Sequence, residues 1–206
     1  LSVCGRAAEA TPWLIRDAVA RGHEIACHGW RWETHAGMDA ATERAIIART
    51  HATLARIAGT PPVGWHTRSA TSPQTRALLV EHGGFRYDSN AYDDDTPYMD
   101  GAHVVLPYAF DTNDMRFSPG GGLVHGRDFS DYVIAAFDRL LAEGAGAARM
   151  LSVGLHTRII GRPARIGALE DILTHVTGRP DVWIAPRREI AAAWAAAHGP
   201  EREGAA

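Results

Sequence analysis

The chain has 206 residues, of which 46% are hydrophobic and 22% charged, a balance typical of a globular domain rather than of a disordered chain. Its formal net charge is -3 and its basic residues are spread along the sequence, which disfavours nucleic acid as a partner. Apolar runs stay short of the roughly 20 residues that cross a bilayer, so we expect a small-molecule partner and no membrane partner.

Length and cysteine content favour one intracellular domain. We expect a single domain over residues 1–199 and a disordered tail at 200–206. Cys4 and Cys27 both lie in apolar, strand-like settings, which favours free thiols in a reducing compartment and therefore the cytoplasm. The sequence begins at Leu1 without a methionine, so we expect part of the N-terminus to be missing.

The first half of the chain alternates short apolar runs with helical patterns. A strand is predicted at 1–4, a helix at 11–22 and a second strand at 24–27. Asp39 is the predicted N-cap of a helix that runs to Ala58 and stops at Gly59. Next come a strand at 63–66, a helix at 73–81 and a strand at 85–89, before an acidic loop at 90–98.

The second half continues the alternation with wider spacing. Strands are predicted at 104–107, 150–155 and 182–184, and helices at 128–143, 166–177 and from 188 onward. About seven strands with helices between most of them predict an α/β fold with a parallel sheet, compatible with an irregular barrel that is incomplete at its N-terminus.

Polar residues follow several of these strands. Because parallel strands point the same way, we expect these residues to meet at one mouth. The clusters are His28 with Trp30, Trp32 and Glu33; Trp65 with His66 and Arg68; Asp88 with residues 92–95; Asn113 with Asp114 and Arg116; and His156 with Arg158.

Two histidines stand out because each directly follows a predicted buried strand. His28 and His156 are therefore candidates for a cleft with a tuned pKa. The other histidines at 23, 51, 82, 103, 175 and 198 are interpreted as structural. The acidic residues at 93–95 also fit a solvated loop, and the aromatic residues either fill the mouth or contact a planar ligand.

Whether the site can bind a metal ion depends on the residues around His28. A catalytic zinc site needs three convergent protein ligands and one open position. Trp32 stands four residues after His28 and cannot coordinate zinc, and neither Glu33 nor His35 has the needed spacing. We therefore expect no metal cofactor, with zinc or another divalent metal on His28 as the alternative.

Several motifs follow one another in a familiar order. They are His-Gly-Trp-Arg-Trp-Glu at 28–33, Pro-Val-Gly-Trp at 62–65, Gly-Gly-Phe-Arg-Tyr-Asp-Ser at 83–89, Asp-Asp-Thr-Pro-Tyr at 94–98, Asp-Thr-Asn-Asp-Met-Arg-Phe at 111–117, Leu-Ser-Val-Gly-Leu-His at 151–156 and Gly-Arg-Pro at 161–163. From residue 1 to about 198 the chain resembles the polysaccharide deacetylase superfamily. Metal-dependent members carry histidine at the position of Trp32, and the tryptophan version resembles the allantoinase-like branch, regarded as metal-independent.

The resemblance implies a deformed (β/α) barrel and hydrolysis of a non-peptide C–N bond. It places His28 in the pocket, Arg68 at the arginine of the third motif, Asp88 at the aspartate of the fourth and His156 at the last motif's histidine. Substrate contacts are expected from Trp30, Trp32, Glu33, Trp65, Asp94, Asp95, Asn113 and Arg158. The family's general-base aspartate ends a first barrel strand, and no such strand precedes Leu1.

Three functions stay open at this point. The first is metal-free hydrolysis of a cyclic amide or ureide, with His28 or a carboxylate as base, His156 as acid, and Arg68 or Arg158 stabilising the oxyanion. The second is metal-dependent deacetylation of an N-acetylated carbohydrate. The third is a non-catalytic binding protein derived from this fold. Self-association into a homo-oligomer is open as well.

Overall fold

The computed structural model of the chain describes residues 1–199, so the predicted disordered tail at 200–206 lies outside the described residues. The chain divides into two compact units. The first comprises Leu1–Ala91, Pro97–Leu106 and the chain from Ala185 onward, and the second comprises Tyr92–Thr96 and Pro107–Ile184. The single domain expected over residues 1–199 stays a prediction.

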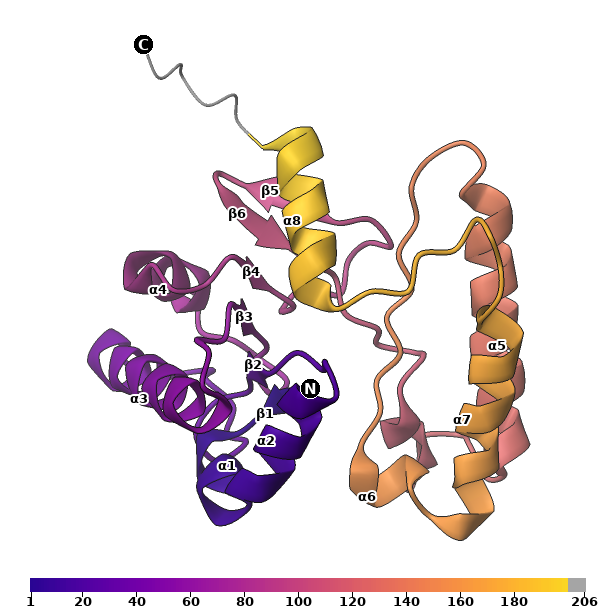
Figure 1. Ribbon diagram of the computed structural model, residues 1–206, viewed down its shortest axis with the longest axis horizontal. Coiled ribbons are helices and arrows are strands. Elements are labelled where there is room, and N and C mark those ends of the chain that lie inside the picture. Colours follow the sequence, from indigo (N-terminus) through magenta and orange to yellow (C-terminus); the bar gives the residue numbers. More distant parts are fainter. Residues whose placement is uncertain (200–206) are drawn as a thin grey trace. The chain divides into compact units, whose positions relative to one another are not determined.

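The first unit is built on one mostly parallel sheet (Figure 1). Its strand order is β1-β2-β3-β4-β6-β5, and only β5 runs antiparallel, paired with β6. The strands are β1 (Ser2–Val3), β2 (Ala26–Cys27), β3 (Gly64–Trp65), β4 (Tyr87–Asp88), β5 (Tyr98–Asp100) and β6 (His103–Val105). The predicted α/β fold with a parallel sheet is therefore confirmed, and within residues 1–199 the sheet does not close into a barrel.

Five helices belong to the first unit: α1 (Gly5–Ala10), α2 (Pro12–Ala20), α3 (Ala40–Ala58), α4 (Thr75–His82) and α8 (Arg187–His198). The α3 boundaries follow the sequence signals. The Asp39 side chain accepts a hydrogen bond from the Thr42 N–H at 2.9 Å, and Gly59 ends the helix in the left-handed conformation that glycine adopts without strain. Helix α8 lies beside β5 and β6 (Figure 1).

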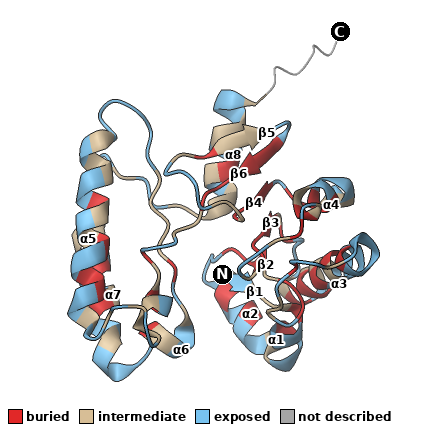
Figure 2. Cartoon of the chain, turned by 180° about the vertical axis from the view of Figure 1, so that it is seen from behind, coloured by how far each residue is buried: buried red, intermediate tan, exposed pale blue. Residues whose placement is uncertain are grey.

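The core of the first unit lies between α1 to α4 and the strands. Figure 2 shows buried residues concentrated on the strands and along α3. The cluster includes Ala8, Ile15, Cys27, Ile47, Leu54, Trp65, Leu79 and Phe85. Cys4 and Cys27 are free thiols, as predicted, and burial raises the pKa of Cys4 to about 11, which makes it a poor nucleophile.

A close approach of two strands explains a glycine in β3. A Cβ atom at Gly64 would lie 2.1 Å from the Tyr87 ring of β4, so only glycine fits there. The Tyr87 hydroxyl donates a hydrogen bond to the buried Glu24 carboxylate at 2.8 Å, and Glu24 also accepts the N–H of Arg188 at 2.9 Å. This contact joins the sheet to the start of α8.

The second unit packs two long helices side by side. They are α5 (Gly126–Glu143) and α7 (Pro163–Val176), and Figure 1 shows them in contact. The 3-10 helix η1 (Asp114–Phe117) and the short helix α6 (Thr157–Ile160) complete the unit. Its core is the cluster of Phe129, Val133, Ile160, Ala168 and Ile172.

Two predicted strands are wrong. The segment 150–155 forms only an isolated bridge between Gly154 and Asn113, and 182–184 has no strand. Both are short apolar runs, a signal that fits several structures, and Trp183 and Ile184 are about 60% exposed rather than buried. Five of the seven predicted strands are thus present, and β5 (Tyr98–Asp100) adds a strand that was not predicted, so the sheet has six strands within the described chain. None of the described helices has the length and apolar character needed to cross a lipid bilayer.

Candidate functional site

His28 follows β2 and is held at both ring nitrogens. Its Nδ1 lies 2.5 Å from the backbone oxygen of His66, and its Nε2 lies 3.1 Å from the indole Nε1 of Trp32. A carbonyl only accepts and an indole N–H only donates, so Nδ1 carries the proton and Nε2 accepts. The ring also stacks on that of His66 at 4.9 Å between centroids. These contacts fix His28 as a neutral imidazole of one tautomer.

Trp32 and Arg68 complete this cluster. The Arg68 guanidinium carbon lies 4.4 Å from the centroid of the Trp32 ring, a cation–π contact between the loops that follow β2 and β3. Trp32 has φ 64° and Ser69 has φ 55°, and these are the only non-glycine residues with positive φ among those described. Such backbone strain persists only where surrounding contacts fix it. The structure therefore brings together His28, Trp32 and Arg68.

A metal does not fit this cluster. A metal-bound histidine offers one ring nitrogen to the metal while the other is held by a carbonyl or carboxylate. His28 has the held Nδ1, but its Nε2 accepts the indole N–H of Trp32. Among residues 1–199 there is no group of three or more His, Cys, Asp or Glu side chains arranged to hold a metal ion.

Asp88, the predicted catalytic carboxylate, is fully buried at the end of β4. It accepts hydrogen bonds from Arg76 Nε at 2.8 Å and from His103 Nε2 at 3.1 Å. Burial alone would raise its pKa, but these hydrogen bonds and the Arg76 charge outweigh burial and lower the pKa below its usual value. Asp88 also accepts the Asn90 N–H, and Asn90 in turn accepts the Thr67 N–H. Asp88 thus anchors the loop before Arg68.

The remaining predicted residues of the first unit are mostly packed inside. Trp65 is fully buried in the core, and its indole N–H donates to Thr67 at 2.8 Å. Trp30 is 6% exposed and lies between α1 and α3, with the Arg49 guanidinium 3.6 Å from its ring. Glu33 accepts the backbone N–H groups of Trp30 and Arg31 and so closes the turn after His28. The role of these three residues in contacting substrate stays a prediction.

The second unit contains a histidine–carboxylate dyad. His156, the residue before α6, has Nδ1 2.6 Å from Oδ1 of Asp114, which lies at the start of η1. Asp114 is fully buried and also accepts the N–H groups of His156 at 2.7 Å and Ile160 at 3.2 Å. The carboxylate only accepts, so Nδ1 of His156 is the donor and the imidazole is held in one orientation, as in other carboxylate-oriented histidines.

The other predicted site residues of the second unit make contacts of their own. Asn113 adjoins Asp114 in sequence, caps η1 and donates to the Tyr108 hydroxyl at 3.3 Å. Arg158 is exposed, with a guanidinium nitrogen 3.8 Å from Met115 sulfur. Asp94 accepts the N–H groups of Asp95 and Thr96 and therefore shapes its own turn. The meeting of residues from both units at one mouth stays a prediction.

The sequence analysis placed Asp114 and His66 in the polar clusters after strands but gave neither of them a role. Asp114 stood beside Asp111 and Asn113 without any pattern that singled it out, and only its burial under His156 does so. His66 supplies the oxygen that fixes the His28 tautomer through its backbone, which no side-chain pattern can indicate.

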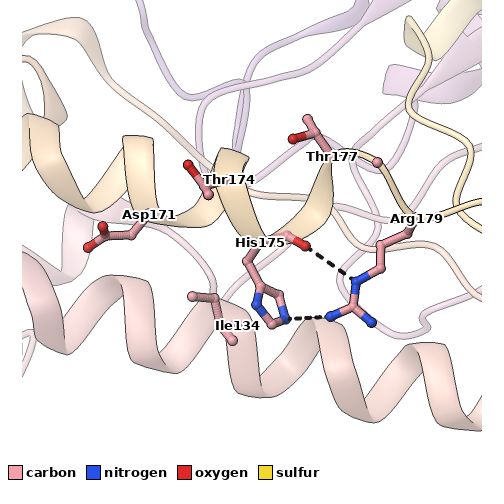
Figure 3. A pocket seen from close by; sticks show the side chains of 7 residues that line it. Ile134, Asp171, Thr174, His175, Thr177 and Arg179 are labelled. Carbon is pink, nitrogen blue, oxygen red and sulfur yellow. Dashed lines mark hydrogen bonds between the residues drawn. The ribbon is translucent and has the colours of Figure 1, made fainter.

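A cavity in the second unit is lined by none of these residues. It has a volume of about 550 Å³ and lies between α5 and the C-terminal end of α7. Figure 3 shows Arg179 reaching to His175, whose Nε2 is 2.8 Å from Asp138. None of the predicted site residues lines this cavity, and its arginine and histidine already contact a carboxylate.

Comparison with known proteins places the chain in a family. The sequence profile described as polysaccharide deacetylase matches residues 2–87. A Schizosaccharomyces pombe protein that carries the polysaccharide deacetylase name is 32% identical over 215 residues, which cover 94% of this chain and 67% of the relative. The chain thus spans about two thirds of that relative's length.

Solved structures agree with this assignment. PuuE allantoinase is 44% identical, with a TM-score of 0.90 over 96% of this chain and 67% of that one. A probable polysaccharide deacetylase from Pseudomonas aeruginosa PAO1 is 45% identical, with a TM-score of 0.92 over 98% and 69% of the two chains. The chain therefore belongs to the polysaccharide deacetylase family.

Proposed function

We propose that this protein hydrolyses a carbon–nitrogen bond of a small cyclic ureide or amide without a metal ion. The observation that carries the proposal is the Trp32 indole N–H on His28 Nε2, because it occupies the lone pair that a metal would take. The 44% identity to PuuE allantoinase supports the choice of a cyclic ureide. The substrate is therefore a small molecule with a planar amide group.

Each unit supplies its own candidate groups to the proposed reaction, and their meeting at one substrate stays the prediction made from the sequence. His156, oriented by Asp114, donates a proton to the leaving nitrogen as the ring opens. Arg68, held on Trp32, offers a cation to the oxyanion that forms on the attacked carbonyl. His28 serves to bind and orient, since both of its ring nitrogens are hydrogen bonded. Water adds to the carbonyl carbon and gives its proton to a carboxylate or to His28 as base, the two candidates that the sequence predicts, while the C–N bond breaks and its nitrogen takes the proton of His156.

The test is turnover of a panel of cyclic ureides by the purified protein before and after dialysis against a chelator. We expect ring opening, followed as the release of a ureido acid, at a rate that the chelator leaves within about twofold. Activity that disappears with the chelator and returns with zinc or cobalt would refute the metal-free proposal.

A second candidate is deacetylation of an N-acetylated sugar. The observation that favours it is the 45% identity to the structure described as a probable polysaccharide deacetylase. It predicts acetate release from N-acetylated amino sugars and none of the ring-opened product. Tight ligand binding with neither reaction would instead support the non-catalytic alternative. A cytoplasmic location and self-association stay predictions.

A further inference from the structure

A buried polar network lies beneath the loops that carry Trp32 and Arg68. Its centre is Glu43, a fully buried residue in the first turn of α3. The Glu43 carboxylate contacts His35 Nδ1 at 2.8 Å and accepts the hydroxyls of Ser72 and Thr75, both at 2.5 Å. A carboxylate is rarely buried without such partners because desolvation is costly.

The network joins three separate segments of the first unit. His35 belongs to the loop after β2, Ser72 to the loop after β3, and Thr75 begins α4. The same two loops are also joined directly, because the backbone oxygen of Ala70 accepts the N–H of His35, the N–H of Ala36 and the hydroxyl of Thr34. The two loops are thus held together on the side of α3.

These same loops contain the strained residues of the site. Trp32 lies three positions before His35, and Ser69 lies three positions before Ser72; both have positive φ. His35 is fully buried, its ring lies 5.7 Å from that of Trp65, and its Nε2 has no hydrogen-bond partner within the described chain. A Cβ atom on Gly29, the residue after His28, would lie 3.7 Å from this Nε2. The ring therefore lies directly beneath the turn that carries His28.

We propose that Glu43 is a positioning residue: through His35 and Ser72 it sets the two loops so that Trp32 reaches His28 and Arg68 stacks on Trp32. Glu43, His35 and Ser72 do not need to touch the substrate for this role. The effect on catalysis rests on the function proposed above, whereas the effect on the geometry of His28 and Trp32 does not.

The test compares Glu43→Gln with Glu81→Gln. The glutamine at 43 keeps the shape but loses the charge, and its NH₂ group cannot accept from a hydroxyl. Glu81 is a matched control because its pairing with Arg44 is exposed. Nitrogen NMR reports the tautomer of His28 and the indole N–H of Trp32, whose resonance is assigned by its loss in Trp32→Phe.

We expect Glu43→Gln to move both signals and Glu81→Gln to leave them in place. In turnover, misplacement of Arg68 lowers kcat by about 100-fold, a larger effect than the change in KM, because Arg68 acts on the reacting bond. A folded Glu43→Gln protein with unchanged His28 and Trp32 signals would overturn the proposal.

A second variant covers the case in which Glu43→Gln does not fold. Ser72→Ala keeps the Glu43 charge with two partners and removes one link to the second loop. It should move the Trp32 signal in the same direction by a smaller amount, and no movement in this variant overturns the proposal. If the signals move but even the wild-type protein lacks turnover, the positioning role stands and the proposed function fails.

Discussion

The indole nitrogen of Trp32 lies 3.1 Å from Nε2 of His28, and Nδ1 of the same imidazole lies 2.5 Å from the backbone oxygen of His66. The two contacts together use one donor and one acceptor of the ring. A neutral imidazole of fixed tautomer is the result, and it is suited to orient a polar ligand or a neighbouring group. The strained backbone at Trp32 is the local cost of this arrangement.

Trp32→Phe tests that contact directly. It removes the N–H donor and keeps an aromatic face for Arg68. We expect kcat/KM to fall about tenfold, the equivalent of one hydrogen bond of roughly 1.4 kcal/mol, measured by steady-state kinetics. Trp13→Phe, on an α2 residue that is 66% exposed, is the control and should change nothing. A faster Trp32→Phe protein would instead identify His28 as the base, released from its donor.

The His156–Asp114 dyad predicts two related losses. His156→Ala should lower turnover on the order of 10²-fold or more if the imidazole is the general acid. Asp114→Asn should cause a comparable loss, because an amide no longer holds the correct tautomer. Asp111→Asn is the matched control, since Asp111 is exposed. Its carboxylate accepts the Tyr132 hydroxyl, and its backbone oxygen accepts a hydrogen bond from Arg116. Full activity in His156→Ala would remove this residue from the mechanism.

Much of the fold could be predicted where local signals agreed. Asp39 and Gly59 bracket α3 because a side-chain cap and a left-handed glycine each leave a strong sequence pattern. The strands at 150–155 and 182–184 failed because a short apolar run has no periodicity that separates a strand from an extended loop. Helix α1 at 5–10 was missed for the same reason, since six residues are too few for a helical pattern.

The candidate site could be predicted only in part, because most of its contacts join residues that are far apart in the sequence. His28 and Trp32 are four residues apart, so their relation could be considered from the sequence, although as a question of metal ligation rather than as a hydrogen bond. Asp114 and His156 are 42 residues apart, and nothing local pairs them. The burial of Asp88 under Arg76 and His103 likewise depends on residues of separate elements.

Asp88→Asn is expected to destabilise the first unit by roughly 3 kcal/mol, the typical cost of removing one partner from a buried ion pair. Asp100 provides the control, because it pairs with the same Arg76 but is exposed, so Asp100→Asn should cost less than about 1 kcal/mol. Urea unfolding of both variants measures the difference. Equal effects from the two substitutions would contradict the role given to Asp88.

The same carboxylate predicts a pH dependence. The pKa of Asp88 is lower in the folded chain than its ordinary value, so the folded state binds its proton less readily than the unfolded state. Its stabilisation is therefore fully present above the unfolded pKa of about 4 and is lost as pH falls through the lowered folded value. The stability difference between wild type and Asp88→Asn should shrink at acid pH. A difference that stays constant from pH 7 to pH 3 would show that Asp88 acts through packing and not through charge.

Gly64→Ala tests the close approach of β3 and β4. The added Cβ atom would lie 2.1 Å from the Tyr87 ring, and Tyr87 is itself fixed by Glu24, so the ring cannot move without breaking a buried hydrogen bond. We expect a loss of about 2 kcal/mol or more in the free energy of unfolding. Gly167→Ala in α7 is the opposite case, since nothing lies within 4 Å of its added Cβ atom. There alanine should stabilise by about 0.5–1 kcal/mol, because glycine inside a helix is unfavourable. Thermal unfolding of both variants gives the answer. Tolerance of Gly64→Ala would show that β3 and β4 are more widely spaced than the structure has them, and destabilisation by Gly167→Ala would show that the space beside Gly167 in α7 is not open.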